Sequence, residues 1–256
     1  MMAPARGLPP APRLPPPRLI PGRAAVFLDI DGTLLELAAT PDQVEVHHEV
    51  KTLLPALSQR LNGALALITG RTLADADRLF PGMALPVAGL HGLVRRTPEG
   101  HVHSPPPLPD IGRLRGELAT FVARHGGLLL EDKGSSLAVH YRKAPRLAPH
   151  VYRIVRKRVA NAHASWRLQP GKAMVEIGPV GRDKGTAICE FMTERPFHGR
   201  TPVFVGDDRT DEHGFAVVRS LGGLAIKVGP GSTIANHRLH DVAAVRRWLD
   251  DAVAIG

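Results

Sequence analysis

Residues 24–33 read AAVFLDIDGT, and this stretch decides how the rest of the chain is interpreted. Residues 24–30 form a nearly continuous apolar run, which is typical of a strand buried on both faces of a parallel sheet. The run ends in Asp29, Asp31 and Gly32, where the chain is expected to turn. The stretch therefore predicts a buried parallel strand whose carboxyl end carries two carboxylates.

Apolar strands and helices alternate on both sides of a middle segment. The predicted strands are 65–68, 87–90, 202–205 and 224–228, and the predicted helices are 49–61, 72–79, 184–193, 212–218 and 242–253. This order indicates an α/β fold in which helices cover a parallel sheet. We expect that sheet to be built from residues 24–94 together with 179–256.

The middle segment has a different pattern. It contains short strands at 128–131, 137–141, 166–169 and 174–177, with helices at 111–125 and 148–162. A turn at 98–100 further predicts a hairpin of 94–96 with 101–103. Residues 95–178 are therefore interpreted as an α+β module inserted between the halves of the first domain.

The first 23 residues differ in composition from the rest. They contain scattered arginines and six prolines between residues 9 and 17. Proline forbids a regular helix and favours an extended chain. Residues 1–23 are therefore predicted to form a disordered Pro/Arg-rich tail.

Composition also limits the compartment and the partners. No apolar run approaches the roughly 20 residues of a membrane span, and no signal-peptide core follows the first arginines, so we expect a cytoplasmic protein without membrane contact. The single cysteine, Cys189, agrees with a reducing compartment and is expected to be a small buried residue. The net charge of +9 suits either nucleic acid or a phosphate-bearing substrate. The 4% aromatic content and the lack of a zinc-finger spacing argue against nucleic acid.

Polar groups gather where the predicted parallel strands end, which is where such sheets bind ligands. Asp29 and Asp31 lie on the same side of an extended chain, and their mutual repulsion is relieved by a cation or by protonation of one of them. Mg²⁺ takes hard oxygen ligands of this kind. Asp207 and Asp208 form a second acidic pair after another buried strand. Asp207 is expected to share the cation.

Three further positions suit a phosphoryl group. Lys184 supplies positive charge, Thr69 a hydroxyl, and Gly70 a close approach of the backbone. Taken one at a time, a solvated lysine and a strand-ending threonine are the ordinary interpretations. Arg71 is equally consistent with anion binding and with pairing to a carboxylate. Residues 211 and 212 are interpreted as helix-capping carboxylates.

In combination, DxDGT (29–33), Thr69, Lys184 and GDDxTDE (206–212) resemble the haloacid dehalogenase-like phosphatases. The segments LITGR (67–71), GLHG (89–92), VHYR (139–142), KAMVEIGP (172–179) and VFVGDDRTDEHGF (203–215) are similar to those of trehalose-6-phosphate phosphatases. The resemblance implies a Rossmann-like core with an inserted α+β cap. It covers nearly everything from Arg23 onward.

The resemblance also implies roles for individual residues. Asp29 is expected to be the nucleophile and Asp31 the acid and base, while Asp208 orients the metal shell or Lys184. Mg²⁺ is expected on the side chains of Asp29 and Asp207 and on the backbone carbonyl of Asp31. Thr69 and Lys184 are expected to hold the phosphoryl group. The expected substrate-binding residues are Gly70, Arg71, His91, Gly92, Arg142, Lys172 and Glu176.

Two alternatives remain open at this point. A related capped phosphatase acting on another sugar phosphate, such as sucrose phosphate or mannosyl-3-phosphoglycerate, differs only in the cap. A catalytically silent sugar-phosphate-binding module, partnered with a trehalose-phosphate synthase, belongs to another functional class. His91 is equally consistent with a core position, and Arg142 and Glu176 with a surface ion pair. The expected partners are trehalose 6-phosphate and a synthase.

Overall fold

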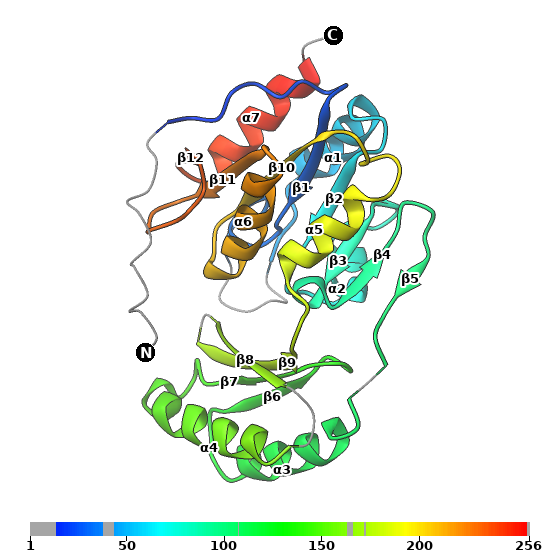
Figure 1. Cartoon of the computed structure of the whole chain (residues 1–256). Helices are drawn as coiled ribbons and strands as arrows, with labels where there is room; N and C mark the ends of the chain where they lie inside the picture. Colours follow the sequence, from blue (N-terminus) through cyan, green and yellow to red (C-terminus); the bar gives the residue numbers. More distant parts are fainter. Residues whose placement is uncertain (1–13, 38–43, 107, 163–165, 172, 255–256) are drawn as a thin grey trace, which may run out of the picture. The chain divides into compact units, whose positions relative to one another are not determined.

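Eight strands form one hydrogen-bonded sheet in the first of two compact units. The computed structural model describes residues 14–37, 44–106, 108–162, 166–171 and 173–254. The units are Met1–His103 with Asp183–Gly256, and Ser104–Arg182. The strand order of the first unit is β12-β11-β10-β1-β2-β3-β4-β5 (Figure 1). Its strands are β1 (Ala24–Leu28), β2 (Leu65–Ile68), β3 (Val87–Gly89), β4 (Val94–Arg96), β5 (Val102–His103), β10 (Thr201–Gly206), β11 (Leu224–Val228) and β12 (His237–Leu239).

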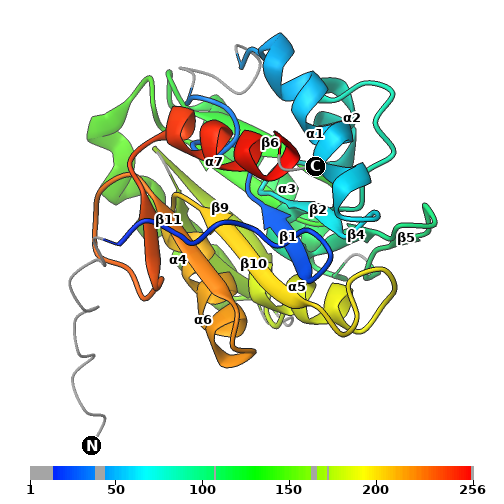
Figure 2. The ribbon, with the colours of Figure 1, turned by 90° about the horizontal axis from the view of Figure 1, so that it is seen from above.

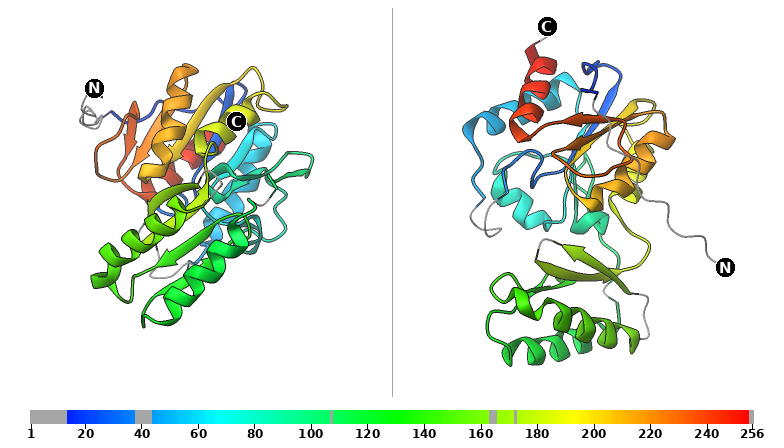
Figure 3. Two further views of the ribbon diagram at one scale, coloured as in Figure 1. Left: turned by 60° about the horizontal axis from the view of Figure 1, so that its bottom comes forward. Right: turned by 90° about the vertical axis from the view of Figure 1, so that its left-hand side faces the viewer.

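Helices cover both faces of this sheet, as the alternating pattern predicts. Helices α1 (His48–Arg60) and α7 (Val242–Ala254) lie together on one face, and α5 (Lys184–Met192) and α6 (Glu212–Ser220) on the other (Figure 3). Helix α2 (Leu73–Leu79) begins at a capping box of Thr72 and Asp75. Strands β12, β11, β10, β1, β2 and β3 run parallel. The predicted α/β class is confirmed.

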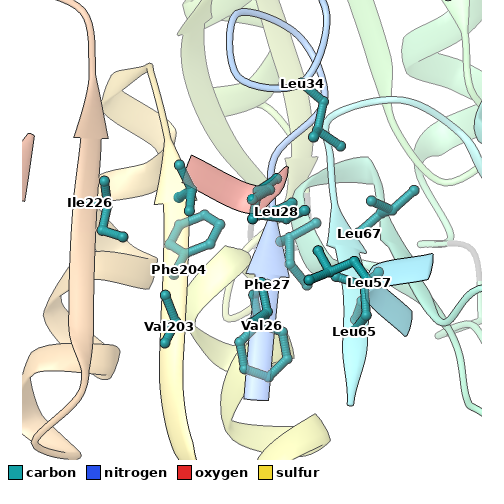
Figure 4. Packing of buried hydrophobic residues seen from close by; sticks show 14 of the residues in the cluster. Val26, Phe27, Leu28, Leu34, Leu57, Leu65, Leu67, Val203, Phe204 and Ile226 are labelled. Carbon is teal, nitrogen blue, oxygen red and sulfur yellow. The ribbon is translucent and has the colours of Figure 1, made fainter. Parts of the chain in front are cut away.

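The core is built around β1, in which every residue is buried. Phe27 stacks on Phe197 at 5.3 Å between ring centroids and lies 6.0 Å from Phe191 of α5. Leu28 and Phe204 pack among the branched residues of the neighbouring strands (Figure 4). Burial on both faces stabilises the strand by about 1.5–3 kcal/mol for each large side chain. The loops at its carboxyl end are therefore anchored on a rigid element.

The second unit is a four-stranded antiparallel sheet, in the order β6-β7-β9-β8. Its elements are α3 (Ile111–Ala123), β6 (Leu129–Asp132), β7 (Leu137–His140), the short helix η3 (Pro145–Leu147), α4 (Ala148–Ala160), β8 (Trp166–Gly171) and β9 (Met174–Pro179). Both α-helices lie on one face of the sheet (Figure 1). The alternate side chains of the strands therefore point to the opposite face, away from the helices.

The boundary between the units differs from the predicted one. Strand β4 pairs with β3, and β5 pairs with β4, so the hairpin belongs to the eight-stranded sheet and not to the inserted module. The guanidinium of Arg95, which is only 5% exposed, pairs with Glu194 at 2.7 Å and with Glu190 at 3.1 Å. These ion pairs hold the hairpin against the end of α5. The inserted unit thus begins at residue 104 and not at 95.

The predicted disordered tail is wrong for its second half. Residues 14–23 run beside α7 (Figure 2), and residues 1–13 lie outside the described residues. The Trp248 indole donates to the Pro17 carbonyl at 3.0 Å, and the Arg238 amide donates to the Leu14 carbonyl at 3.1 Å. Proline removes backbone donors but keeps its carbonyl acceptors, which here satisfy donors of the folded unit. Leu19 is buried in the core at 5% exposure.

Leu19→Ala is expected to lower the free energy of unfolding by about 2–4 kcal/mol, because it leaves a cavity under the segment. At roughly 2–4 °C per kcal/mol this is a fall in Tm of about 5–15 °C, measured by thermal melting. Leu14→Ala is the matched control, since that side chain is 68% exposed. Equal Tm values for the two variants would show that residues 14–23 do not dock in solution.

Cys189 also differs from the sequence prediction. The buried residues of α5 include Ala187, Ile188 and Phe191, whereas Cys189 is an exposed free thiol. It lies on the outer face of the helix, about 100° round from its buried neighbour. The exposure of Cys189 thus follows from its position on the helix and not from the apolar character of its side chain.

Candidate active site

Three polar residues lie at one edge of the parallel sheet. Asp29, Thr69 and Asp207 directly follow β1, β2 and β10, and β1 is hydrogen-bonded to both other strands. In the register, Leu28 is opposite both Val205 and Leu67. The polar residues therefore start from neighbouring points at the carboxyl ends of the strands, which is the edge where parallel sheets bind ligands.

The loop after β1 is a tight turn. The amides of Leu34 and Leu35 both donate to the Ile30 carbonyl at 2.9 Å. Gly32 has a positive φ of 82°, and a Cβ at this position would overlap the Asp207 carboxylate. The glycine is thus needed for its backbone conformation and for the close approach of the second acidic loop.

Lys184 joins the two halves of the first unit at this edge. Its ammonium group lies 2.8 Å from Oδ1 of Asp29 and 2.6 Å from Oδ1 of Asp211, and its side chain is 2% exposed. Helix α5 starts at this residue because Asp183 and Thr186 form a capping box. The cap fixes the first turn, so the lysine is held against the nucleophile candidate.

Asp211 is the residue that sequence reasoning missed. It was interpreted as a helix cap, and one of its oxygens does accept the Asp208 amide at 2.8 Å. Its other oxygen pairs with Lys184, and the residue is completely buried. Among the described residues the carboxylate partners of Lys184 are Asp29 and Asp211, and the expectation that Asp208 orients the metal shell or Lys184 stays a prediction. The sequence Thr210-Asp211-Glu212 does not indicate which of its two acidic residues is buried.

The electrostatics of this cluster are dominated by burial. Burial raises the pKa of Asp29 well above its usual range; Lys184 opposes this, and Asp211 and Asp207 add to it. Burial lowers the pKa of Lys184, but Asp211 and Asp29 outweigh it, so that the pKa is raised. Lys184 is therefore charged. Its single positive charge does not balance the three carboxyl groups of Asp29, Asp207 and Asp211.

The same cluster fits a divalent cation. Asp29, Asp207 and Asp211 each offer a carboxylate oxygen, and these three atoms lie within 4.8 Å of one another. Hard oxygen donors of this kind suit a small divalent ion. The predicted ligands Asp29 and Asp207 are thus brought together, with Asp211 in addition.

Arg71 pairs with the predicted acid–base residue. Its Nε and Nη2 donate to the two carboxylate oxygens of Asp31, each at 2.7 Å. Burial lowers the pKa of Arg71, but the hydrogen bonds and charge of Asp31 reverse the shift and raise it. Of the two interpretations of Arg71, the structure shows the ion pair. The bidentate geometry fixes the orientation of the Asp31 carboxylate.

The loops after β2 and β3 lie against each other. The Arg71 amide donates to the fully buried Thr69 hydroxyl at 3.1 Å, and the His91 amide donates to the Thr69 carbonyl at 2.9 Å. A Cβ at Gly70 would overlap the His91 ring. Gly92, the next residue, lies against the carbonyl of Asp183. The predicted residues Gly70, Arg71 and His91 are therefore brought together around Thr69, and Gly92 lies at the start of α5.

The predicted sugar-binding residues belong to the second unit. Glu176 of β9 is 5% exposed, and its carboxylate accepts from Ser136 at 3.4 Å and pairs with Lys133 at 3.5 Å. Arg142 is exposed after β7, and Lys172 lies outside the described residues. Lys133, the partner of Glu176, lies in the loop between β6 and β7.

One face of the second sheet carries a row of polar residues. Ala138 is opposite both Glu131 and Glu176 in the register, and Glu176 is opposite Gln169. The neighbouring residues Val139 and Val175 pack under the helices. Because side chains alternate along a strand, the polar row lies on the face without helices.

The chain is similar to known trehalose-phosphate phosphatases. The family model described as Trehalose-phosphatase matches residues 27–243. The chain is 47% identical over 206 residues to a probable trehalose-phosphate phosphatase of Sinorhizobium fredii, covering 80% of this chain and 78% of the relative. It is 45% identical over 228 residues to the trehalose-6-phosphate phosphatase of Escherichia coli, covering 88% and 85%.

Solved structures give the same picture. The crystal structure of a trehalose-6-phosphate phosphatase related protein superposes with a TM-score of 0.74 at 25% identity, covering 90% of this chain and 97% of that one. The C-terminal domain of the Candida albicans trehalose-6-phosphate phosphatase gives a TM-score of 0.79 at 18% identity, covering 92% and 94%, and shows the fold alone.

Proposed function

The chain belongs to the trehalose-phosphatase family, and from this premise we propose that it hydrolyses trehalose 6-phosphate to trehalose and phosphate. The observation that carries the proposal is the buried Asp29 carboxylate at the end of β1. It is held by Lys184 at 2.8 Å and lies two residues before an acid that Arg71 orients. A nucleophile beside an oriented acid–base group is the arrangement that covalent phosphoryl transfer requires.

The proposed reaction has two steps on Asp29. Its carboxylate oxygen attacks the phosphorus atom and the bond from phosphorus to the sugar oxygen breaks. Asp31, protonated once its ion pair with Arg71 has opened, gives its proton to that oxygen. Asp31 then takes a proton from a water molecule that attacks the aspartyl-phosphate. Phosphate leaves and the Asp29 carboxylate is restored. Thr69 and Lys184 hold the phosphoryl oxygens throughout.

We propose Mg²⁺ as the cation of this site. Asp29, Asp207 and the backbone carbonyl of Asp31 would hold it, with Asp211 beside them. The bound ion would supply positive charge against the phosphoryl oxygens. Arg71 engages the Asp31 side chain, so the oxygen of Asp31 that we assign to the cation is its backbone carbonyl. The close approach of Asp207 to Gly32 supports the same assignment.

The test of the function is phosphate release from a panel of sugar phosphates, with Mg²⁺ and with chelator. The panel contains trehalose 6-phosphate, glucose 6-phosphate, sucrose 6-phosphate and mannosyl-3-phosphoglycerate. We expect Mg²⁺-dependent release with a strong preference for trehalose 6-phosphate. Preference for another compound would retain the chemistry and reject the substrate. No release from any compound would favour a silent binding module.

Sugar recognition is proposed for the polar face of the second sheet. Glu176→Gln is expected to raise KM for trehalose 6-phosphate about tenfold, with a smaller change in kcat, because charged groups form strong hydrogen bonds to hydroxyls. The matched control is Glu117→Gln, which also removes a paired carboxylate of this unit. Equal KM values for the two variants would remove Glu176 from the sugar site. Arg142 and Lys172 remain predictions for the same role.

The net positive charge of the chain lies in the second unit. Residues 104–182 contain 14 Lys and Arg and 5 Asp and Glu, a net charge of +9, and the rest of the chain has 19 of each. A unit of this charge attracts a dianionic phosphate ester at low ionic strength. Raising the salt from about 20 to about 200 mM is therefore expected to lower kcat/KM several-fold with little change in kcat.

Two double variants test this electrostatic effect. Arg156 and Lys157 are exposed on α4, and R156Q/K157Q is expected to lower kcat/KM about twofold at low salt and to flatten its salt dependence. The control K51Q/R247Q removes the same charge from exposed positions of the first unit. Equal effects of the two double variants would mean that only the total charge matters.

The compartment and a protein partner remain proposals. In the described part of the chain, no helix combines the length and apolar character that a bilayer span requires. The free thiol of Cys189 supports a reducing compartment, and we propose the cytoplasm. Association with a trehalose-phosphate synthase is tested by co-sedimentation of the two purified proteins.

A further inference from the structure

Lys227 is a buried lysine that the catalytic roles above do not use. It lies on β11 with 5% exposure, opposite Gly206 of β10 in the register. Its ammonium group donates to the carbonyl of Asp207 in a short hydrogen bond, and to the carbonyl of Val228 at 2.6 Å. Both acceptors are main-chain oxygens at the carboxyl ends of adjacent strands. The side chain thus ties the end of β11 to the first residue of the acidic loop.

A lysine at this position needs an explanation, because burial disfavours its charged form. Burial lowers the pKa of Lys227, and the charges of Asp207 and Asp211 act in the opposite direction. An apolar side chain of similar length would fill the space without this cost, but would leave the buried Val228 carbonyl and the half-buried Asp207 carbonyl without these donors. The requirement is therefore for a long side chain that ends in a donor.

The position of Asp207 depends on its main chain. Its carboxylate lies against Gly32, beside the acids of the cluster. The loop after β10 begins at this residue, so a free carbonyl would allow the peptide to rotate and carry the carboxylate away. The hydrogen bond from Lys227 opposes that rotation. Its positive charge also lies next to an acidic cluster that lacks positive charge.

We propose that Lys227 is a positioning residue for the cation site: it holds the Asp207 carbonyl, and so directs the Asp207 carboxylate toward Asp29 and Asp211. The proposal rests on the proposed function in one respect, the assignment of Asp207 as a cation ligand. Removing a group that hydrogen-bonds to a metal-ligating residue and fixes its orientation typically lowers metal affinity 10- to 100-fold.

The experiment is a titration with Mg²⁺ alone, followed by thermal melting of the full chain. Lys227→Met is expected to raise the Mg²⁺ concentration of the half-maximal Tm increase about tenfold. The half-saturating Mg²⁺ for phosphate release should rise in parallel, while KM at saturating Mg²⁺ stays near the wild-type value. Lys227→Arg keeps a donor and is expected to restore most of the Mg²⁺ affinity.

The matched control is Ile226→Val, a buried residue of the same strand. This variant should lower the Tm without moving the Mg²⁺ midpoint. A wild-type midpoint for Lys227→Met, or the same midpoint for the Met and Arg variants, would overturn the proposal. If Lys227→Met does not fold, Lys227→Leu, which also lacks a donor, replaces it with the same criteria. Because melting with Mg²⁺ needs no substrate, failure of the substrate panel is a separate result.

Discussion

Asp29→Asn is expected to lower kcat for trehalose 6-phosphate by about 10⁴-fold or more, because an amide oxygen does not form the aspartyl-phosphate. The substitution keeps the shape of a side chain that is 5% exposed and leaves Lys184 its bond to Asp211. The fold should therefore survive. Phosphate release and thermal melting of the purified variant measure the two effects.

The control for this variant is Asp250→Asn on α7, an exposed carboxylate outside the cluster. It should retain wild-type kcat. Incubating each protein with substrate and then quenching in acid adds a direct readout, since only chains with Asp29 should carry an acid-stable phosphoryl mass increase. Turnover by Asp29→Asn at the wild-type rate would assign the nucleophile to another residue.

Lys184→Met is expected to remove activity and also to destabilise the chain by about 3–5 kcal/mol. The reason is that breaking a buried ion pair leaves unpaired charge, here on Asp29 and Asp211. The corresponding fall in Tm is about 10 °C without added metal. Because a bound cation replaces part of the lost charge, Mg²⁺ should raise the Tm of this variant more than that of the wild type.

Lys51→Met is the control for Lys184→Met, since residue 51 is exposed on α1. It should change the Tm by less than about 1 °C and leave kcat unchanged. If Lys184→Met melts at the wild-type temperature, the carboxylates would have to be protonated in the folded chain. That outcome would reject the charged cluster described above.

The parallel sheet was predictable because its strands are buried on both faces. AAVFL, LALI and PVFV each read as an unbroken apolar run. Asp29 and Thr69 follow the first two at once, and Asp207 follows the third after Gly206. The apolar residues of a buried strand and the polar residue of the site are therefore close neighbours in the sequence. Position after an apolar run makes Asp29, Thr69 and Asp207 candidates, and the site is predicted only from their combination with Lys184 and the family resemblance.

Other parts of the structure depend on distant contacts that leave no local mark. The β4–β5 hairpin has the same alternation in either unit, and the partners that hold it, Glu190 and Glu194, follow about 95 residues later. Asp211 differs from an ordinary helix cap only through its contact with Lys184. The docking of residues 14–23 depends on Trp248, at the other end of the chain.

The strand order described above has a consequence for biosynthesis. β1 pairs with β2 on one side and with β10 on the other, and β10 begins only at residue 201. At about 5–20 residues per second, this apolar strand waits about 10–35 s for that partner. The inserted unit is continuous in sequence and can fold while the wait lasts. The nascent chain thus exposes AAVFL longest, so stalled synthesis before residue 201 should yield chains that need a chaperone.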